Sequence, residues 1–174
     1  TGPFARASAL SFDLRKSIPY EIYNFINFKV PLGTRGDSYD RFLIRLSEMR
    51  QSLYIILQSI NLLEEGPVNA FDLKTSFDKQ SFKYDMEKLI LHFKRFGQGV
   101  QIAGGSRYSS VESPKGEFGV MLHSVGETKP FRCKIRSPGF YNLQVVPQLG
   151  SNLLISDLVT LIGTLDIVLG EIDR

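Results

Sequence analysis

Apolar side chains recur at three- and four-residue spacing between residues 38 and 63, which is the period of a helix with one buried face. The stripe consists of Tyr39, Phe42, Leu43, Leu46, Met49, Leu53, Ile56, Leu57 and Ile60. Asp37 precedes it and can accept hydrogen bonds from the free N–H groups of a helix start. Gly66 and Pro67 supply an end. The pattern predicts a long helix in a helix-bundle core.

A second helix is predicted over about residues 79–96, with its last turn rich in Lys and Arg and with Gly97 as its C-cap. Its apolar stripe consists of Phe82, Met86, Leu89, Ile90 and Phe93. The connection between the two helices has few regular signals, so we expect them to pack antiparallel. Residues 37–97 would then form a two-helix core.

Beyond Gly104 and Gly105 the apolar period changes from helical to two. Strands are predicted over residues 108–113, 117–124 and 131–136, with a turn at 114–116, so that residues 105–137 form a three-stranded antiparallel meander. An irregular stretch follows, and then a last helix capped by Ser151 or Asn152. Residues 1–36 form an irregular lead-in with at most a short helix over 8–15. The fold class is α+β.

The segment Asp166–Arg174 combines three carboxylates and one guanidinium with four aliphatic side chains. Chain ends usually fray, and frayed ends rarely carry so many apolar residues. Two interpretations remain open: a final amphipathic turn on a surface, or a terminus packed into an interior with its charges held by partners. The second interpretation predicts a buried helix and tail over residues 152–174.

Composition narrows the class of protein. The 174 residues are 43% hydrophobic and 22% charged, with a net charge of +3, as expected for one globular domain. Cys133, His92 and His123 do not supply a metal-binding set. Asp157 and Asp166 interrupt the apolar run from Leu153 to Leu169, which argues against a membrane span. The chain begins at Thr1, so we expect it to start inside a longer protein or to be processed.

Three cations, Arg132, Lys134 and Arg136, alternate along one predicted strand. They suit an anion-binding or nucleic-acid surface, which leaves a stand-alone RNA-binding module of an organelle as an alternative function. A solvated face, or an interface with an acidic partner, is favoured because aromatic residues do not alternate with these cations.

The other motifs have structural interpretations. Glu112 and Glu117 flank the predicted hairpin turn, where we expect them to pair with Arg or Lys. Residues 35–37 spell Arg-Gly-Asp, which we interpret as a helix start. His123 is expected at the surface, and Cys133 is expected to be a buried structural thiol. The residues alone assign no catalytic set.

Several stretches, in collinear order, resemble the 49 kDa subunit of respiratory complex I, NADH dehydrogenase subunit 7. They are Phe12–Lys16, Pro19–Tyr20, Gly33–Asp37, Tyr39–Arg41, Glu48–Ser52, Gly66–Pro67, Glu112–Gly119, Arg132–Arg136, Pro138–Phe140, Ile162–Thr164 and Asp166–Arg174. The hairpin and the tail are the most specific. The resemblance covers a little under half of the family's sequence, its C-terminal part.

This resemblance implies the helical core of the large subunit of nickel–iron hydrogenases. Residues 166–171 lack the cysteines that hold the hydrogenase metal, so the resemblance implies a vacated metal site that became part of a quinone cavity. It places Asp166 and Val168 near that cavity, with Glu171 and Arg174 as structural or electrostatic neighbours. It assigns this chain no catalytic residue and no metal ligand.

The resemblance also implies partners and a location. The chain would be part of proton-pumping NADH:ubiquinone oxidoreductase on the matrix side of the mitochondrial inner membrane, in the peripheral arm, without nucleic acid. A neighbouring iron–sulfur subunit would hold the terminal [4Fe-4S] cluster, and ubiquinone would be shared by the assembly. The N-terminal half of the subunit, on the same chain or a separate one, would supply the residues that hold the quinone head group. Two departures from the family are Phe12 in place of tryptophan and Leu153 in place of histidine.

Overall fold

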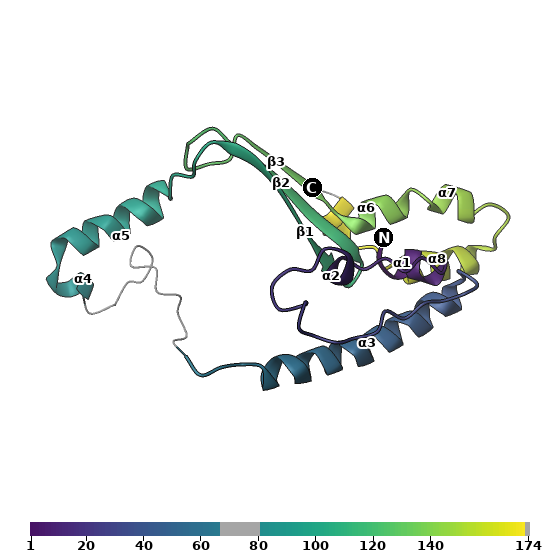
Figure 1. The fold of residues 1–174 in the computed structure, drawn as a ribbon. Helices are drawn as coiled ribbons and strands as arrows, with labels where there is room; N and C mark the ends of the chain where they lie inside the picture. Colours follow the sequence, from purple (N-terminus) through teal and green to yellow (C-terminus); the bar gives the residue numbers. More distant parts are fainter. Residues whose placement is uncertain (67–80, 173–174) are drawn as a thin grey trace. The chain divides into compact units, whose positions relative to one another are not determined.

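The computed structural model describes residues 1–66 and 81–172. Contacts divide the chain into two compact units. The first comprises Thr1–Leu62, Tyr108–Val120 and Ile135–Arg174, and the second comprises Leu63–Arg107 and Met121–Lys134. Figure 1 shows helices α3, α5 and α8 together with a three-stranded sheet, which agrees with the predicted α+β class.

Helix α3, Ser38–Asn61, is the long helix predicted from the apolar stripe. Asp37 caps it by accepting from the Asp40 N–H at 2.7 Å, and Gly36 before it has a φ of +72°, which favours glycine. The prediction for residues 35–37 is therefore confirmed. Helices α1 and α8 pack against α3. Within the described residues α3 buries only Arg41 and Ile44 and leaves its stripe exposed, so the predicted bundle core stays a prediction.

Residues 1–36 are more ordered than the sequence predicts. Helix α1 spans Gly2–Ala7, with Pro3 in its first turn, and helix α2 spans Leu14–Ser17. Asp13 caps α2 by accepting from the Arg15 N–H at 2.9 Å. Most of the segment 8–15, which was expected to be helical, lies between these two helices. Helix α2 begins only at Leu14 because Asp13 is its cap.

The predicted second helix is broken into α4, Ser81–Tyr84, and α5, Met86–Gln98; residues 79 and 80 lie outside the described part. The break falls at Asp85, whose side chain accepts from the N–H groups of Glu87 and Lys88 and so starts a new helix. Gly97 lies inside α5, and Gly99, with a φ of +84°, follows its end. Helix α5 buries none of its residues, so the predicted two-helix core remains a prediction for a larger assembly.

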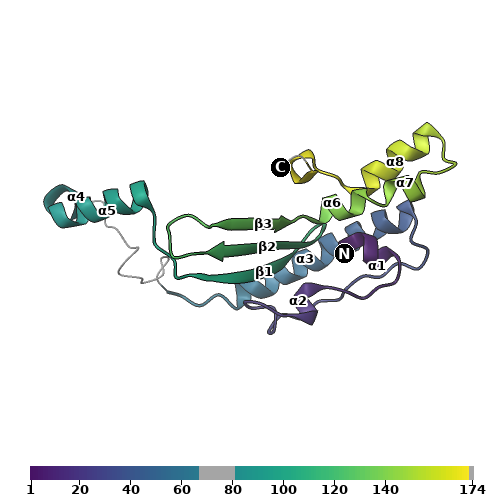
Figure 2. The ribbon, with the colours of Figure 1, turned by 90° about the horizontal axis from the view of Figure 1, so that it is seen from above.

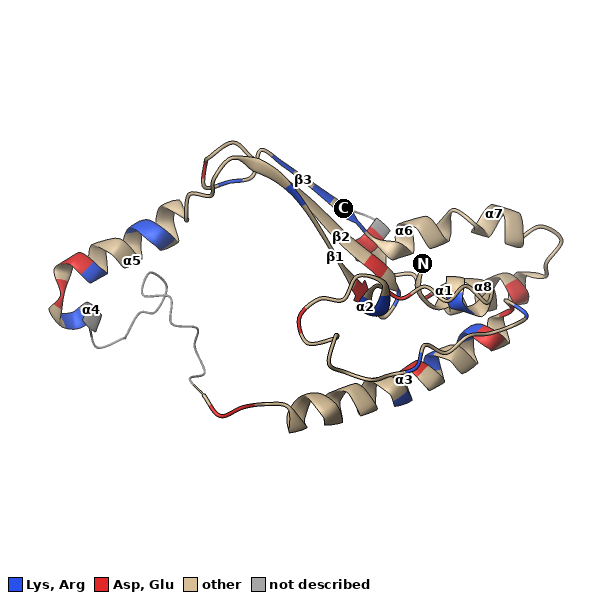
Figure 3. Ribbon diagram, in the orientation of Figure 1, with Lys and Arg blue, Asp and Glu red and all other residues tan. Residues whose placement is uncertain are grey.

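The predicted meander is confirmed. Strands β1 (Gly105–Ser113), β2 (Gly116–Ser124) and β3 (Arg132–Arg136) lie in the order β1-β2-β3, and neighbouring strands run in opposite directions (Figure 2). Pro114 and Lys115 form the turn between β1 and β2. The predicted row of cations lies along β3, where Figure 3 draws the basic positions in blue. The prediction of a buried Cys133 is wrong: the thiol is exposed, because alternation assigns a side chain to a face without providing a layer that covers that face.

The stretch after β3, which the sequence predicts to be irregular, contains two short helices, α6 (Pro138–Leu143) and α7 (Val146–Leu149). Both have proline in the first turn, where its missing N–H is not needed.

Helix α8, Ile155–Leu165, starts later than the predicted Ser151 or Asn152 cap. Asn152 has a φ of +63°, and Asp157 instead accepts from the Leu154 N–H at 3.4 Å. The short helix α9, Leu169–Ile172, ends the described chain.

The small core of the described chain is built from α1, α2, α3, α8 and the segment between α2 and α3, with α1 and α8 both packed against α3. Its buried apolar residues are Ala7, Leu14, Ile26, Phe28, Ile44, Leu161 and Leu165. The expected burial of the last helix and tail is not found within this chain, since α8 buries only Leu161 and Leu165, and Leu169 is 81% exposed. Among the described helices, none combines the length and apolar character that crossing a bilayer requires.

Candidate functional site

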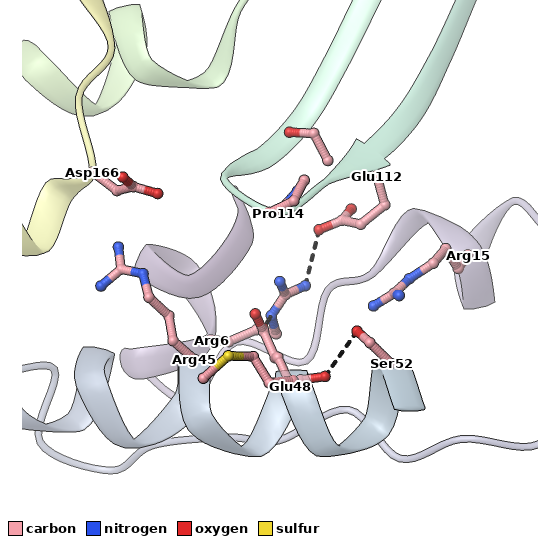
Figure 4. Close-up of a pocket in the computed structure, with 10 residues that line it drawn as sticks. Arg6, Arg15, Arg45, Glu48, Ser52, Glu112, Pro114 and Asp166 are labelled. Atoms are coloured by element: carbon pink, nitrogen blue, oxygen red, sulfur yellow. Dashed lines mark hydrogen bonds and ion pairs between the residues drawn. The ribbon is translucent and has the colours of Figure 1, made fainter. Parts of the chain in front are cut away.

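Arg6 of α1 is the centre of a buried charge network in the first unit. Its side chain is only 2% exposed. Its Nη1 donates to Glu112 Oε1 at 3.0 Å and lies 3.6 Å from Asp13 Oδ2, while its Nε lies 2.6 Å from Glu48 Oε1. Figure 4 shows Arg6 between α3, which carries Glu48, and the hairpin strand that carries Glu112. Three carboxylates from separate parts of the sequence thus surround one guanidinium.

A second guanidinium, that of Arg15, completes the network. It binds Asp13 in bidentate fashion, with Nε–Oδ1 at 3.0 Å and Nη2–Oδ2 at 2.7 Å. Burial alone would raise the pKa of Asp13, but the hydrogen bonds and charge of Arg15 outweigh it and hold that pKa below its usual value. Asp13 is therefore a firmly ionised member of the cluster.

The predicted ion pairing of Glu112 and Glu117 is confirmed. Glu112 binds Arg6 through one oxygen and accepts from the Leu14 N–H through the other, at 3.2 Å. Glu117 pairs with Arg136 and accepts from the Tyr108 hydroxyl at 3.0 Å. One of the three cations of the β3 face is thus occupied within the chain itself.

A cavity of about 360 Å³ opens beside the charge network. Its wall is formed by α1, α3, the β1–β2 turn and the residue that follows α8 (Figure 4). Its charged lining residues are Arg6, Arg15, Arg45, Glu48, Glu112 and Asp166. The volume lies within the usual range of ligand-binding clefts. The lining offers cations, carboxylates and the apolar surface of Met49 and Pro114.

Two arginines of α3 fix the end of α8 at this cavity. Arg45 Nη2 donates to the Thr164 carbonyl at 2.5 Å, and Arg41 Nη2 donates to the Thr164 hydroxyl at 3.2 Å. Cations at the carboxyl end of a helix are favourable because the free carbonyls carry partial negative charge. Burial lowers the pKa of Arg41. Asp166 follows with a φ of +55°, a left-handed turn that ends the helix.

The four residues expected near a functional site lie in different surroundings. Asp166 is exposed and lines the cavity, with its carboxylate on the same side as the Arg45 guanidinium in Figure 4. Val168 is 45% exposed. Glu171 accepts from the Gly139 N–H at 3.0 Å and from the Ser137 hydroxyl through its carbonyl at 3.1 Å, so it ties the tail to α6. Arg174 lies outside the described residues.

Sequence reasoning did not single out Arg6, Asp13 or Glu48 as members of a site. The available signal was that Asp13, Glu48 and Glu112 each fall in a different one of the stretches that carry the family resemblance. Spacing could not bring them together, because they are far apart along the chain. Within the described part, no group of His, Cys, Asp and Glu side chains is arranged to hold a metal ion.

Comparison with known proteins gives a match over the whole chain. Residues 1–174 match the family model described as respiratory-chain NADH dehydrogenase, 49 Kd subunit. A relative from Anaplasma phagocytophilum, named as a subunit of NADH-quinone oxidoreductase, is 50% identical over 100% of this chain. The iron-sulfur protein 2 of NADH dehydrogenase [ubiquinone] from Nephroselmis olivacea is also 50% identical, and the NADH-ubiquinone oxidoreductase 49 kDa subunit of Prototheca wickerhamii is 49% identical, both over the whole chain.

The chain spans 44% of the length of each of these relatives. None of their names describes an RNA-binding protein, so the comparisons do not support the alternative of an RNA-binding module. The pairing of Arg136 with Glu117 also reduces the free positive charge on β3 that such a module would use.

Proposed function

This chain belongs to the family of the 49 kDa subunit of respiratory-chain NADH dehydrogenase, and from this premise we propose that it helps to build the quinone-reduction chamber of a proton-pumping NADH:quinone oxidoreductase. The chain is one part of that chamber. It carries no complete active site alone, and the residues that hold the quinone head group come from the remaining part of the subunit.

The observation that carries this proposal is the place of Asp166 on the wall of the charged cavity. The tail was singled out from the sequence, whereas the cavity follows from the contacts of α1, α3 and the hairpin. Their coincidence supports Asp166 as a chamber residue. Val168, two residues further on and partly exposed, would line the same chamber from the tail.

The cavity lining fits a quinone head group in chemical terms. A quinone offers two carbonyl oxygens and a flat apolar ring, and a site for it needs donors beside apolar surface. Arg45 and Arg15 supply donors here, and Met49 and Pro114 supply apolar contact. The electrons would come from a [4Fe-4S] cluster held by a neighbouring iron–sulfur subunit, and this chain would bind no cofactor by itself.

The exposed apolar surface supports docking onto other parts of the complex. The stripe of α3 includes Leu53 and Ile60, which are 66% and 62% exposed. Exposed apolar area on this scale marks an interface. We place the remaining half of the subunit and other complex I subunits on these faces. A hydrogenase-like helical core would then arise only in the assembled subunit. The location that goes with this function is the matrix side of the mitochondrial inner membrane, in the peripheral arm.

The test is to change Asp166 in the assembled complex. Asp166→Asn removes the charge and keeps a residue that tolerates a φ of +55°. We expect NADH:quinone activity to fall by roughly tenfold or more, because a group beside the reacting centre contributes through charge and proton transfer. NADH oxidation by a hydrophilic artificial acceptor, and the amount of assembled complex, should stay unchanged. Asp166→Ala should give the same loss of quinone activity.

Glu21→Gln is the matched control, since Glu21 is an exposed acid in the first unit with a φ of +52° and lies away from the cavity. It should leave quinone activity unchanged. If Asp166→Asn lowers quinone activity and assembly equally, Asp166 is a structural residue and the proposal loses its main support.

A further inference from the structure

The charge network around Arg6 contains more acids than cations. The carboxylates of Asp13, Glu48 and Glu112 face the guanidiniums of Arg6 and Arg15, so the group carries one excess negative charge when fully ionised. The side chains of Arg6, Asp13 and Glu112 are 2% exposed. An uncompensated charge in such surroundings is costly, and a proton on one carboxyl removes the cost.

Hydrogen bonding decides which carboxyl holds the proton. Both oxygens of Asp13 accept from Arg15, and both oxygens of Glu112 accept hydrogen bonds, from Arg6 and from the Leu14 N–H. The hydrogen bonds and charge of Arg15 stabilise the ionised form of Asp13. Glu48 has a single close cationic partner among the described residues, Arg6, whose Nε lies 2.6 Å from Oε1. Glu48 is the acid of the three whose charge is least supported.

Glu48 also faces the space where a substrate would lie. Its side chain is 16% exposed, more than those of the other two acids, and it lines the cavity together with Asp166. The charged groups around it are Arg6 from α1, Arg15 from α2, Glu112 from β1, Asp166 from the tail and, one turn away on α3, Arg45. Arg45 directs Nη2 at the Thr164 carbonyl and so leaves Glu48 to Arg6.

From this arrangement we infer that Glu48 is a proton-carrying residue of the cavity, which delivers a proton to the quinone during its reduction and regains one from solvent. The inference rests on the proposed function and goes beyond it by assigning the proton donor. Burial raises the pKa of the Glu48 carboxyl even though the Arg6 charge opposes this, which agrees with a proton held there.

This transfer supplies one of the two protons that a quinone takes up on reduction. The O–H bond of the Glu48 carboxyl breaks, and an O–H bond forms on the quinone oxygen. The two electrons would arrive one at a time from the iron–sulfur cluster of the neighbouring subunit, since such a cluster carries a single electron. Glu48 is left as a carboxylate paired with Arg6, and a water proton entering through the cavity restores the acid.

The experiment uses the assembled enzyme with Glu48→Gln, which keeps the size of the side chain and loses the exchangeable proton. We expect kcat for NADH:quinone turnover to fall by about tenfold or more and KM for quinone to stay within about twofold, since a proton donor acts in the transition state. A raised carboxyl pKa means that the donor is lost as pH rises, so the wild-type rate should fall on the alkaline side of that pKa. This limb should be absent in Glu48→Gln.

Infrared difference spectra of the wild-type complex give a second readout, independent of turnover and of whether Glu48→Gln assembles. A protonated-carboxyl band that disappears with rising pH is expected in the wild type and in the Glu64→Gln control, which changes an exposed acid beyond α3. The band should be lost in Glu48→Gln, or shifted in Glu48→Asp. A wild-type complex without such a band, or a Glu48→Gln enzyme with the wild-type pH profile, overturns the inference. If Asp166→Asn is inactive with quinone while Glu48→Gln is normal, only this inference fails; if Asp166→Asn is normal, the proposed function fails.

Discussion

At the scale of single residues, the main finding is a guanidinium removed from water and held by acids from three places in the sequence. Burying one charge costs several kcal/mol unless partners replace its hydration. Arg6 receives this compensation from Asp13 and Glu112, and from Glu48 whenever that carboxyl is ionised. The pairs therefore tie α1 to α3 and to the hairpin. They fix the geometry of the cavity wall more than they add net stability.

Removal of one acid that pairs with Arg6 should show how far the structure depends on these ion pairs. Glu112→Ala leaves Arg6 with one fewer acceptor and frees the Leu14 N–H that Glu112 Oε2 accepts. We expect the local free energy of unfolding to fall by about 3 kcal/mol, the lower end of the range for removing one partner of a buried ion pair. Hydrogen exchange in the assembled complex should show amides of α1 and α2 exchanging roughly a hundredfold faster. Unchanged exchange there would contradict a structural role for the Glu112 pair.

The residue scale is also where prediction from sequence reached its limit. The ion pairs that Glu112 and Glu117 each make with an arginine were predicted, because both acids flank a turn with cations nearby. Arg6, Asp13 and Glu48 were not, because their meeting depends on tertiary packing and no spacing rule joins them. Cys133 was predicted to be buried from alternation alone, but alternation assigns a face to a side chain and cannot say whether another layer covers that face.

At the scale of elements, local capping chemistry accounts for both the successes and the failures. The start of α3 and the hairpin turn were predicted because Gly36, Asp37 and the Pro114–Gly116 segment carry strong local signals. The break at Asp85 and the late start of α8 were missed, since an acid near a helix start can cap or sit in the first turn with equal ease. The short helices α6 and α7 lack a periodic pattern long enough to detect.

Gly36 provides a test at this scale. Gly36→Ala places a Cβ at a φ of +72°, which costs roughly 1–2 kcal/mol for an L-residue. The rate of amide hydrogen exchange in the first turn of α3 should rise about tenfold. Gly97→Ala is the control, since Gly97 lies inside α5 with open space around it and alanine favours a helix. Exchange in α5 should slow. If Gly36→Ala and Gly97→Ala change hydrogen exchange in their own helices equally, the positive φ of Gly36 is not the cause of the faster exchange.

At the scale of the whole molecule, the apolar surface is too exposed for a chain that works alone. Leu154 and Ile155 at the start of α8 are 71% and 83% exposed, and the stripe of α3 is open along its length. Large exposed apolar patches mark interfaces or cause aggregation. The sequence correctly predicted the stripes, and our proposal explains their exposure by other parts of the complex that cover them.

This gives a prediction for the separated chain. Produced by itself, it should bind a hydrophobic dye strongly and aggregate at micromolar concentration. Co-production with the remaining part of the subunit should suppress both effects. Light scattering and dye fluorescence measure this directly. A separated chain that stays monomeric and binds little dye would show that its apolar faces need no cover.

The most direct measurement of the central claim is photoaffinity labelling of the assembled complex with a quinone that carries a photoreactive group on its ring. The label should attach within residues 45–52 of α3 or 164–168 at the end of α8, and excess unmodified quinone should prevent it. Labelling that spares both segments in a fully active complex would contradict the claim that this cavity is part of the quinone chamber.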